Sequence, residues 1–287
     1  MSAAQPRASL RRWWPFAAVL GVALGGLIGY RQWQRSGLEA RLVREDPERV
    51  VADPALVRLA ASLARPVYAR ECASCHGANL EGPRRPGVPA LGDAVWLYGF
   101  GSVTDIETTI LYGIRSGHPK ARNITDMPAF GRVGQLSPAE IHDVVEFVYG
   151  LSHQDVDRAA ARRGNAIFGD KGVCYDCHGP DASGNIDYGA PDLTGRTHTW
   201  LYGGDRADLT LSVTDGRHGL CPAWIWRLRP VQIRALAVYL YEVSQGLTSA
   251  HPGRGGSRAT ATLPVEPAPG PVTPLRGACA SLTGVSS

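Results

Sequence analysis

The longest apolar run of the chain lies near its N-terminus, where residues 13–30 carry no charged side chain. As an α-helix this run would be about 27 Å long, close to the thickness of a bilayer's hydrocarbon core. Trp13, Trp14 and Tyr30 lie at its ends, where aromatic residues occur in membrane helices. A cleaved signal peptide is the alternative, but no small-residue cleavage site follows Tyr30. We therefore expect an uncleaved transmembrane helix at 13–30, behind a cytoplasmic N-terminus at 1–12.

Two later segments have apolar residues at the spacing of an amphipathic helix. Their stripes are Ile141, Val144, Val145, Val148 and Tyr149 behind the capping box Ser137-Pro138-Ala139-Glu140, and Ile233, Leu236, Ala237, Leu240 and Tyr241 behind Pro230. An earlier helix is expected after Asp53-Pro54. No alternating strand pattern of useful length is present. The sequence predicts an all-α fold in which each stripe packs on the N-terminal helix of its own domain.

The stretch from about residue 55 to 248 is an internal duplication. Trp96-Leu97-Tyr98-Gly99 recurs as Trp200-Leu201-Tyr202-Gly203, and Met127-Pro128-Ala129 is matched by Cys221-Pro222-Ala223. A repeat of about 100 residues is too long for a solenoid unit and fits one whole domain per copy. We expect tandem domains at 55–152 and 156–248. A linker at 31–54 precedes them, and a Pro- and Gly-rich disordered tail at 249–287 follows.

Length and charge exclude some classes of function. The 287 residues suffice for two small domains with appendages. The formal net charge of +4 is small, and no basic cluster is interleaved with aromatic residues, so nucleic acid is not an expected partner. The six cysteines carry the most specific signal.

Four of these cysteines belong to two copies of Cys-x-x-Cys-His. The copies are Cys72-Ala73-Ser74-Cys75-His76 and Cys174-Tyr175-Asp176-Cys177-His178. This is the attachment signature of a c-type haem, in which the cysteines bond the porphyrin and the histidine is the proximal iron ligand. A thioredoxin-like dithiol lacks the histidine, and no further pair stands at zinc-finger spacing. The sequence predicts a diheme cytochrome c with two covalently bound haem c groups.

A haem of this class needs a second axial ligand, and methionine is the usual one in electron carriers. The chain has two methionines, and Met1 lies on the far side of the expected anchor. Met127 is therefore expected to ligate the iron of His76. A methionine packed in the core is the alternative.

The second iron is then left without a methionine, because Cys221 stands at the matching position. A thiolate there would stabilise Fe(III) and lower the potential. Cys221 could instead pair with Cys279 in a disulfide, or it could be an unligated thiol, with His218 or His198 taking the iron or the site left open. We favour Cys221 as the axial partner of His178.

Trp96 and Trp200 recur at matching places in the two copies, as do Arg115 and Arg217. Arginine suits a carboxylate fork, so these four residues are candidate haem contacts, with the propionates as partners of the arginines. A surface arginine and a core tryptophan are the alternatives.

With these residues in view, the chain resembles the diheme subunit III of cbb3-type cytochrome c oxidases, the CcoP/FixP family. The specific stretches are Gly189-Ala190-Pro191-Asp192-Leu193-Thr194, Trp200-Leu201-Tyr202-Gly203-Gly204 and Asp215-Gly216-Arg217-His218-Gly219. The resemblance covers residues 50–248 and the N-terminal run.

The resemblance implies two cytochrome c folds and an electron-transfer subunit that is not itself catalytic. Its expected partners are a haem–copper catalytic subunit, a monohaem cytochrome subunit and a cytochrome c donor. The expected location is a bacterial inner membrane, crossed once, with the haem domains in the periplasm, where covalent haem is attached.

Cys221 departs from the family, in which methionine is the second ligand of each iron. His/Cys haem pairing resembles that of sulfur-oxidising cytochromes such as thiosulfate dehydrogenases. The alternative functions are therefore oxidation of a sulfur compound at the second haem, or a membrane electron shuttle without an oxidase.

Overall fold

The computed structural model describes residues 14–82, 86–153, 155–195 and 201–246. The expected all-α class is confirmed: these residues form ten helices and, apart from isolated bridges, no strand. Several expectations concern residues outside the described ranges, namely the N-terminus 1–12, Trp13, His198, Trp200, the tail 249–287 and Cys279.

Helix α1 (Trp14–Arg44) is longer than the apolar run from which it was expected. Along its N-terminal half the apolar side chains are exposed, from Phe16 to Ile28, whereas Leu42 near its end is fully buried. Within the described ranges, none of the helices combines the length and hydrophobicity needed to cross a bilayer, so the anchor expected at 13–30 is not detected.

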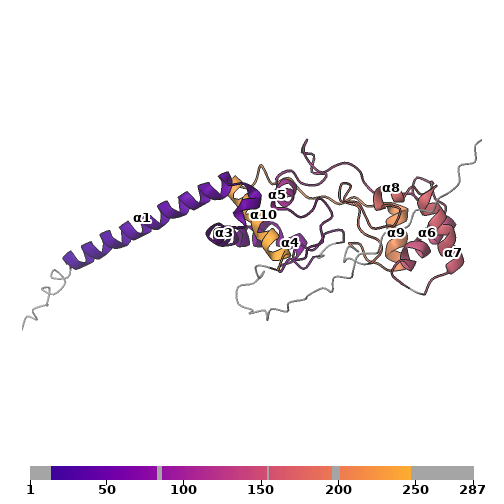
Figure 1. The fold of residues 1–287 in the computed structure, drawn as a ribbon, viewed down its shortest axis with the longest axis horizontal. Coiled ribbons are helices and arrows are strands. Elements are labelled where there is room, and N and C mark those ends of the chain that lie inside the picture. The colour runs from indigo at the N-terminus through magenta and orange to yellow at the C-terminus, as the bar shows by residue number, and fades with distance from the viewer. Residues whose placement is uncertain (1–13, 83–85, 154, 196–200, 247–287) are drawn as a thin grey trace, which may run out of the picture. The chain divides into compact units, whose positions relative to one another are not determined.

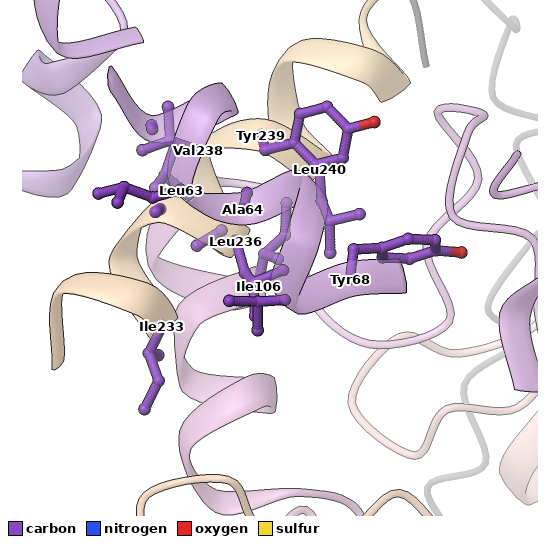
Figure 2. Packing of buried hydrophobic residues seen from close by; sticks show 14 of the residues in the cluster. Leu63, Ala64, Tyr68, Ile106, Ile233, Leu236, Val238, Tyr239 and Leu240 are labelled. Carbon is purple, nitrogen blue, oxygen red and sulfur yellow. The ribbon is translucent and has the colours of Figure 1, made fainter. Parts of the chain in front are cut away.

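The first of two helical cores contains helices from both ends of the chain (Figure 1). This first bundle consists of α2 (Pro47–Val50), α3 (Pro54–Glu71), α4 (Ala73–His76), α5 (Val103–Tyr112) and α10 (Pro230–Ser244). As expected, Asp53 caps α3 by accepting hydrogen bonds from the backbone of Ala55 and Leu56. Figure 2 shows its core, where Leu63, Ala64 and Tyr68 of α3 lie with Ile106 of α5 and with Ile233, Leu236 and Leu240 of α10.

The second bundle consists of α6 (Pro138–Gly150), α7 (Arg158–Gly169), α8 (Tyr175–His178) and α9 (Arg206–Asp215). The expected capping box at Ser137 and Glu140 starts α6. Two ion pairs fasten α6, since Arg163 of α7 binds buried Asp143 at 2.7 Å and Arg206 of α9 binds buried Glu146 at 2.5 Å. Gly164 lets α7 approach the carbonyl of Asp143 closely.

The two terminal helices are exchanged relative to the sequence expectation. Helix α10 packs on α3 and α5, and α6 packs on α7 and α9. The reason lies in the connections: only a short loop joins α6 to α7, and helices joined by a short loop pack as antiparallel neighbours. The two apolar stripes are equivalent in pattern, so the stripe alone does not determine which bundle each helix completes.

Candidate functional site

Each Cys-x-x-Cys-His motif ends in a one-turn helix, α4 or α8, that places its histidine. The backbone N–H of His76 donates to the carbonyl of Cys72 at 3.0 Å, and that of His178 donates to the carbonyl of Cys174 at 2.9 Å. Each histidine is followed by a glycine at positive φ, which ends the turn. The cysteines and the histidine of one motif therefore lie on one tight turn.

Both histidine rings are oriented by a proline carbonyl. The Nδ1 atom of His76 lies 2.9 Å from the carbonyl oxygen of Pro89, and that of His178 lies 3.0 Å from the oxygen of Pro191. A carbonyl only accepts hydrogen bonds, so Nδ1 carries the proton and Nε2 keeps a free lone pair. Burial lowers the pKa of both histidines, which favours the neutral ring that a metal requires.

The role of these two prolines was not predicted, although the sequence carries a signal for it. Each proline lies 13 residues after its histidine. The offset is conserved between the two copies of the repeat, so comparing the copies around their histidines would have found both.

Burial also raises the pKa of the motif cysteines Cys72, Cys174 and Cys177. It raises that of Cys72 to about 12, with the nearby Cys221 adding to the effect, and that of Cys174 to about 11. These three thiols are therefore neutral in the chain itself. Neutral, partly buried cysteines beside a histidine with a free Nε2 fit covalent attachment of haem.

Met127 lies with the second motif. Its side chain packs against the core of the second bundle, as Cys174 and Leu193 do. The Met127 backbone forms two hydrogen bonds with Arg217, of 3.2 and 3.1 Å. From the sequence we expected Met127 to serve His76; the structure instead brings it to the bundle that contains His178.

Cys221 lies with the first motif. Burial raises the pKa of Cys221 to about 11, with Cys75 adding to the effect, and Cys221 in turn adds to the raised pKa of Cys72. The Cys221 backbone forms two hydrogen bonds with Ile114, of 3.0 and 2.9 Å. Trp224, three residues after Cys221, packs against the first core. Each candidate second ligand thus lies with the motif of the other half of the chain: Cys221 with the first motif and Met127 with the second. The terminal helices are exchanged between the two bundles in the same way.

The expected haem-contact residues differ in their surroundings. Trp96 packs against the first core, and its buried Nε1–H has no hydrogen-bond partner among the described residues. A haem propionate would supply the missing acceptor, so this orphaned donor fits the cofactor.

The two arginines already have protein partners. Arg115 donates to the carbonyls of Gly219 and Thr125, and Arg217 donates to the hydroxyl of Ser212. The guanidinium of Arg217 also lies 4.1 Å from the ring centre of Tyr202. The arginines are therefore less available to a propionate than Trp96 is.

The remaining histidine expectation concerns His218. Its Nδ1 lies 2.8 Å from a carboxylate oxygen of Asp126, and its side chain is exposed. This contact does not bring His218 to either motif.

Two family models match the two halves of the chain. Residues 61–152 match cytochrome c, and residues 159–240 match the model described as cytochrome c oxidase, cbb3-type, subunit III. The expected pair of haem c groups is thereby confirmed.

Several cbb3-type oxidase subunits are similar to the chain over most of its length. A FixP subunit from a Bradyrhizobium species is 44% identical over 68% of this chain and 64% of its own length, so the chain spans slightly less than two thirds of that relative. A CcoP subunit of Cereibacter sphaeroides is 38% identical over 81% of both chains. A CcoP subunit of Rhodobacter capsulatus is 40% identical over 73% of this chain and 71% of its own.

Proposed function

The chain belongs to the CcoP/FixP family, subunit III of cbb3-type cytochrome c oxidases, and we propose that it passes electrons from cytochromes c to the oxidase core. It is a membrane-associated diheme electron-transfer subunit that forms a complex with the other oxidase subunits. Its proposed direct partners are the haem–copper catalytic subunit, the monohaem cytochrome subunit and a cytochrome c donor. The subunit itself is proposed to be non-catalytic.

The observation that carries this proposal is the matched orientation of the two histidines. Two buried rings, each with Nδ1 held by a proline carbonyl, present Nε2 beside a pair of cysteines. We propose Cys72, Cys75, Cys174 and Cys177 as the covalent attachment residues and the two histidines as proximal ligands. Haem iron bound in this way supplies a one-electron couple, and the protein tunes it through the second ligand.

We propose a crossed pairing of the axial ligands, His76 with Cys221 and His178 with Met127. It is supported by the placement of Cys221 beside Cys72 and Cys75, and of Met127 in the core that includes Cys174. In the chain alone the thiol of Cys221 is neutral, so binding as a thiolate must release a proton. A thiolate favours Fe(III) and a thioether favours Fe(II), which makes the first site the low-potential one.

Trp96 is proposed as a propionate contact of the first haem because of its orphaned N–H. For Arg115, Arg217 and Trp200 a propionate role stays a sequence-based proposal. Trp200 lies outside the described residues.

We further propose a single-pass position in a bacterial inner membrane, with the haem domains in the periplasm. The proposal is supported by the exposed apolar side chains of α1, among them Phe16, Val19 and Val22, and by haem attachment outside the cytoplasm. Alkaline extraction of membranes tests it, since a chain held only by protein contacts would be released. Digestion of intact spheroplasts tests orientation, because periplasmic domains would be cleaved.

The test of function is purification of the tagged full-length chain from its own membranes. We expect a haem–copper catalytic subunit to co-purify and added reduced cytochrome c to reduce the haem of higher potential, that of His178 and Met127. Isolation as a lone cytochrome, or reduction by thiosulfate at a useful rate, would contradict the proposal. A redox titration should give two waves, and Cys221→Met should move only the lower one.

A further inference from the structure

We propose that Arg115 is a positioning residue that couples the second axial ligands of both irons, although it contacts neither ligand. The proposal rests on the crossed ligand pairing proposed above. Arg115 lies in the first half of the chain, on the turn after α5, and its side chain is only 11% exposed.

One edge of the Arg115 guanidinium holds the segment that carries Cys221. Its Nε donates to the carbonyl of Gly219 at 2.5 Å. Gly219 stands two residues before Cys221, whose backbone is paired with Ile114, the neighbour of Arg115. The backbone of the segment that carries Cys221 is therefore held by both Arg115 and Ile114.

The same guanidinium holds the segment that carries Met127. Its Nη1 donates to the carbonyl of Thr125 at 2.9 Å, and its Nε lies 3.1 Å from a carboxylate oxygen of Asp126. These two residues directly precede Met127. A planar fork with five donors can bind several acceptors at once, which an ammonium group does less well.

Arg115 is also linked, through Tyr98, to the segment that orients His178. Its Nη1 lies 3.3 Å from the hydroxyl of Tyr98. The ring of Tyr98 packs so closely on Gly189 that a Cβ there would overlap it. Gly189 stands two residues before Pro191, the acceptor that orients His178. The Arg115 side chain thus contacts the segments that carry Cys221 and Met127. Through Tyr98 it is also linked to the segment that orients His178.

The matching arginine of the second repeat lacks this role. The Arg217 guanidinium binds Ser212 and the carbonyl of Asp208, both on α9. The backbone of Arg115 differs too, because its φ of +48° is unusual for a residue with a side chain. Strain of this kind persists where surrounding contacts over-determine the conformation. The coupling is therefore a property of Arg115 and not of the repeat.

The experiment compares Arg115→Gln, Arg115→Lys and the control Arg122→Gln in the full-length chain with both haems bound. Arg122 is a matched control because its guanidinium is also partly buried and lies 5.5 Å from the ring centre of Tyr98, but it binds Thr109 and Asp105 and neither ligand segment. The thiolate signal in electron paramagnetic resonance reports the Cys221 site, and the methionine-to-iron charge-transfer band reports the Met127 site. Redox titration gives both potentials.

We expect Arg115→Gln to change both spectral signals and to move both redox waves, with smaller shifts in Arg115→Lys and none in Arg122→Gln. If Arg115→Gln does not retain two haems per chain, Arg115→Lys, which keeps the charge, decides the question by the same readings. A change at one site only, as a propionate partner would give, overturns the proposal, as does a change at neither.

Failure of the ligand assignment can be told apart from failure of the coupling. Cys221→Met and Met127→Leu are measured in the same series. If Cys221→Met removes the thiolate signal while the Arg115 variants move nothing, the assignment stands and the coupling is wrong. If Cys221→Met changes nothing, the assignment fails irrespective of Arg115.

Discussion

Gly113 lies against the carbonyl oxygen of Cys221, so closely that an added Cβ would overlap it. Gly216 lies in the same way against the carbonyl of Met127. Both glycines end a helix, with φ, ψ of +73°, −173° and +70°, +179°, a region open to glycine almost alone. The two ligand segments are therefore seated on the two glycines by close backbone approach.

Gly113→Ala is expected to displace the segment of Cys221 and alter the thiolate signal, because both the φ and the overlap oppose a Cβ. We expect a loss of about 1–3 kcal/mol in the free energy of unfolding. Chemical denaturation and electron paramagnetic resonance measure the two effects. Gly117→Ala is the control, since Gly117 also has a positive φ but has no atom within 4 Å of the Cβ position. Equal effects of the two variants would exclude a role for the contact with Cys221.

Because α10 packs in the first bundle, we predict that a residue near the end of the described chain stabilises the haem site of His76. Ile233 of α10 and Ile141 of α6 stand at the same position of their helices and are 1% and 4% exposed. We expect Ile233→Ala to loosen the site of His76 and Ile141→Ala that of His178, each at about 2–5 kcal/mol. Thermal unfolding followed through the thiolate and methionine signals measures this. The opposite assignment would show that each half of the chain folds on its own.

Acid stability should depend on Glu146. The hydrogen bond from Arg206 is the main cause that lowers the pKa of Glu146 below its ordinary 4.5, so the folded state favours the ionised form. The stabilisation is complete above pH 4.5 and is lost as pH falls through the lowered value. The hydrogen bond from Arg163 likewise lowers the pKa of Asp143, so protonation of Asp143 adds to the loss of stability in acid.

We expect Glu146→Gln to cost about 1–2 kcal/mol at pH 7, the low end for a charged hydrogen bond because Arg206 is partly exposed. Its stability should then fall less than that of the parent between pH 5 and pH 3 (about the range of carboxyl titration). Melting temperatures across this range are the measurement. Asp155→Asn serves as control, because Asp155 is 76% exposed and 3.8 Å from the same arginine. A parallel pH profile of Glu146→Gln and the parent would count against the pair.

Trp96→Phe distinguishes a bound propionate from an orphaned donor. If the propionate of the first haem accepts the Nε1–H, the variant loses about 1–2 kcal/mol of stability and shifts the potential of that haem alone. If the donor stays without a partner, replacing it with an apolar ring is neutral or stabilising. Denaturation and redox titration of the chain with bound haems, with Trp224→Phe as a control in the same core, give the sign.

Local structure could be predicted well from the sequence because its determinants are local. The capping box at Ser137 and the stripe behind it form a helix whose Ile141, Val144 and Val145 are buried, as the spacing predicts. The repeated Cys-x-x-Cys-His motif likewise predicted both haem c groups. In these cases the residues that define the element lie within two helical turns of one another.

The exchange of α6 and α10 between the bundles could not be predicted, because it depends on which of two equivalent bundles each apolar stripe packs against. Ile141 and Ile233 occupy the same place in the same pattern, and only the short loop after Gly150 distinguishes their surroundings. The support given to Gly189 by Tyr98 was also hidden, since it joins residues far apart in sequence through a close contact. Apolar periodicity carries no information about such pairs.

The packing of α10 on α3 has a consequence for biosynthesis. As the part of the chain that follows α1 is made and exported, Cys72 and Cys75 arrive long before Leu236, and contacts of such sequence separation form slowly. Cys72 and Cys75 are therefore not yet enclosed by α10 while the second motif is still being synthesised. The attachment machinery has its longest access to the haem site whose enclosure is finished last.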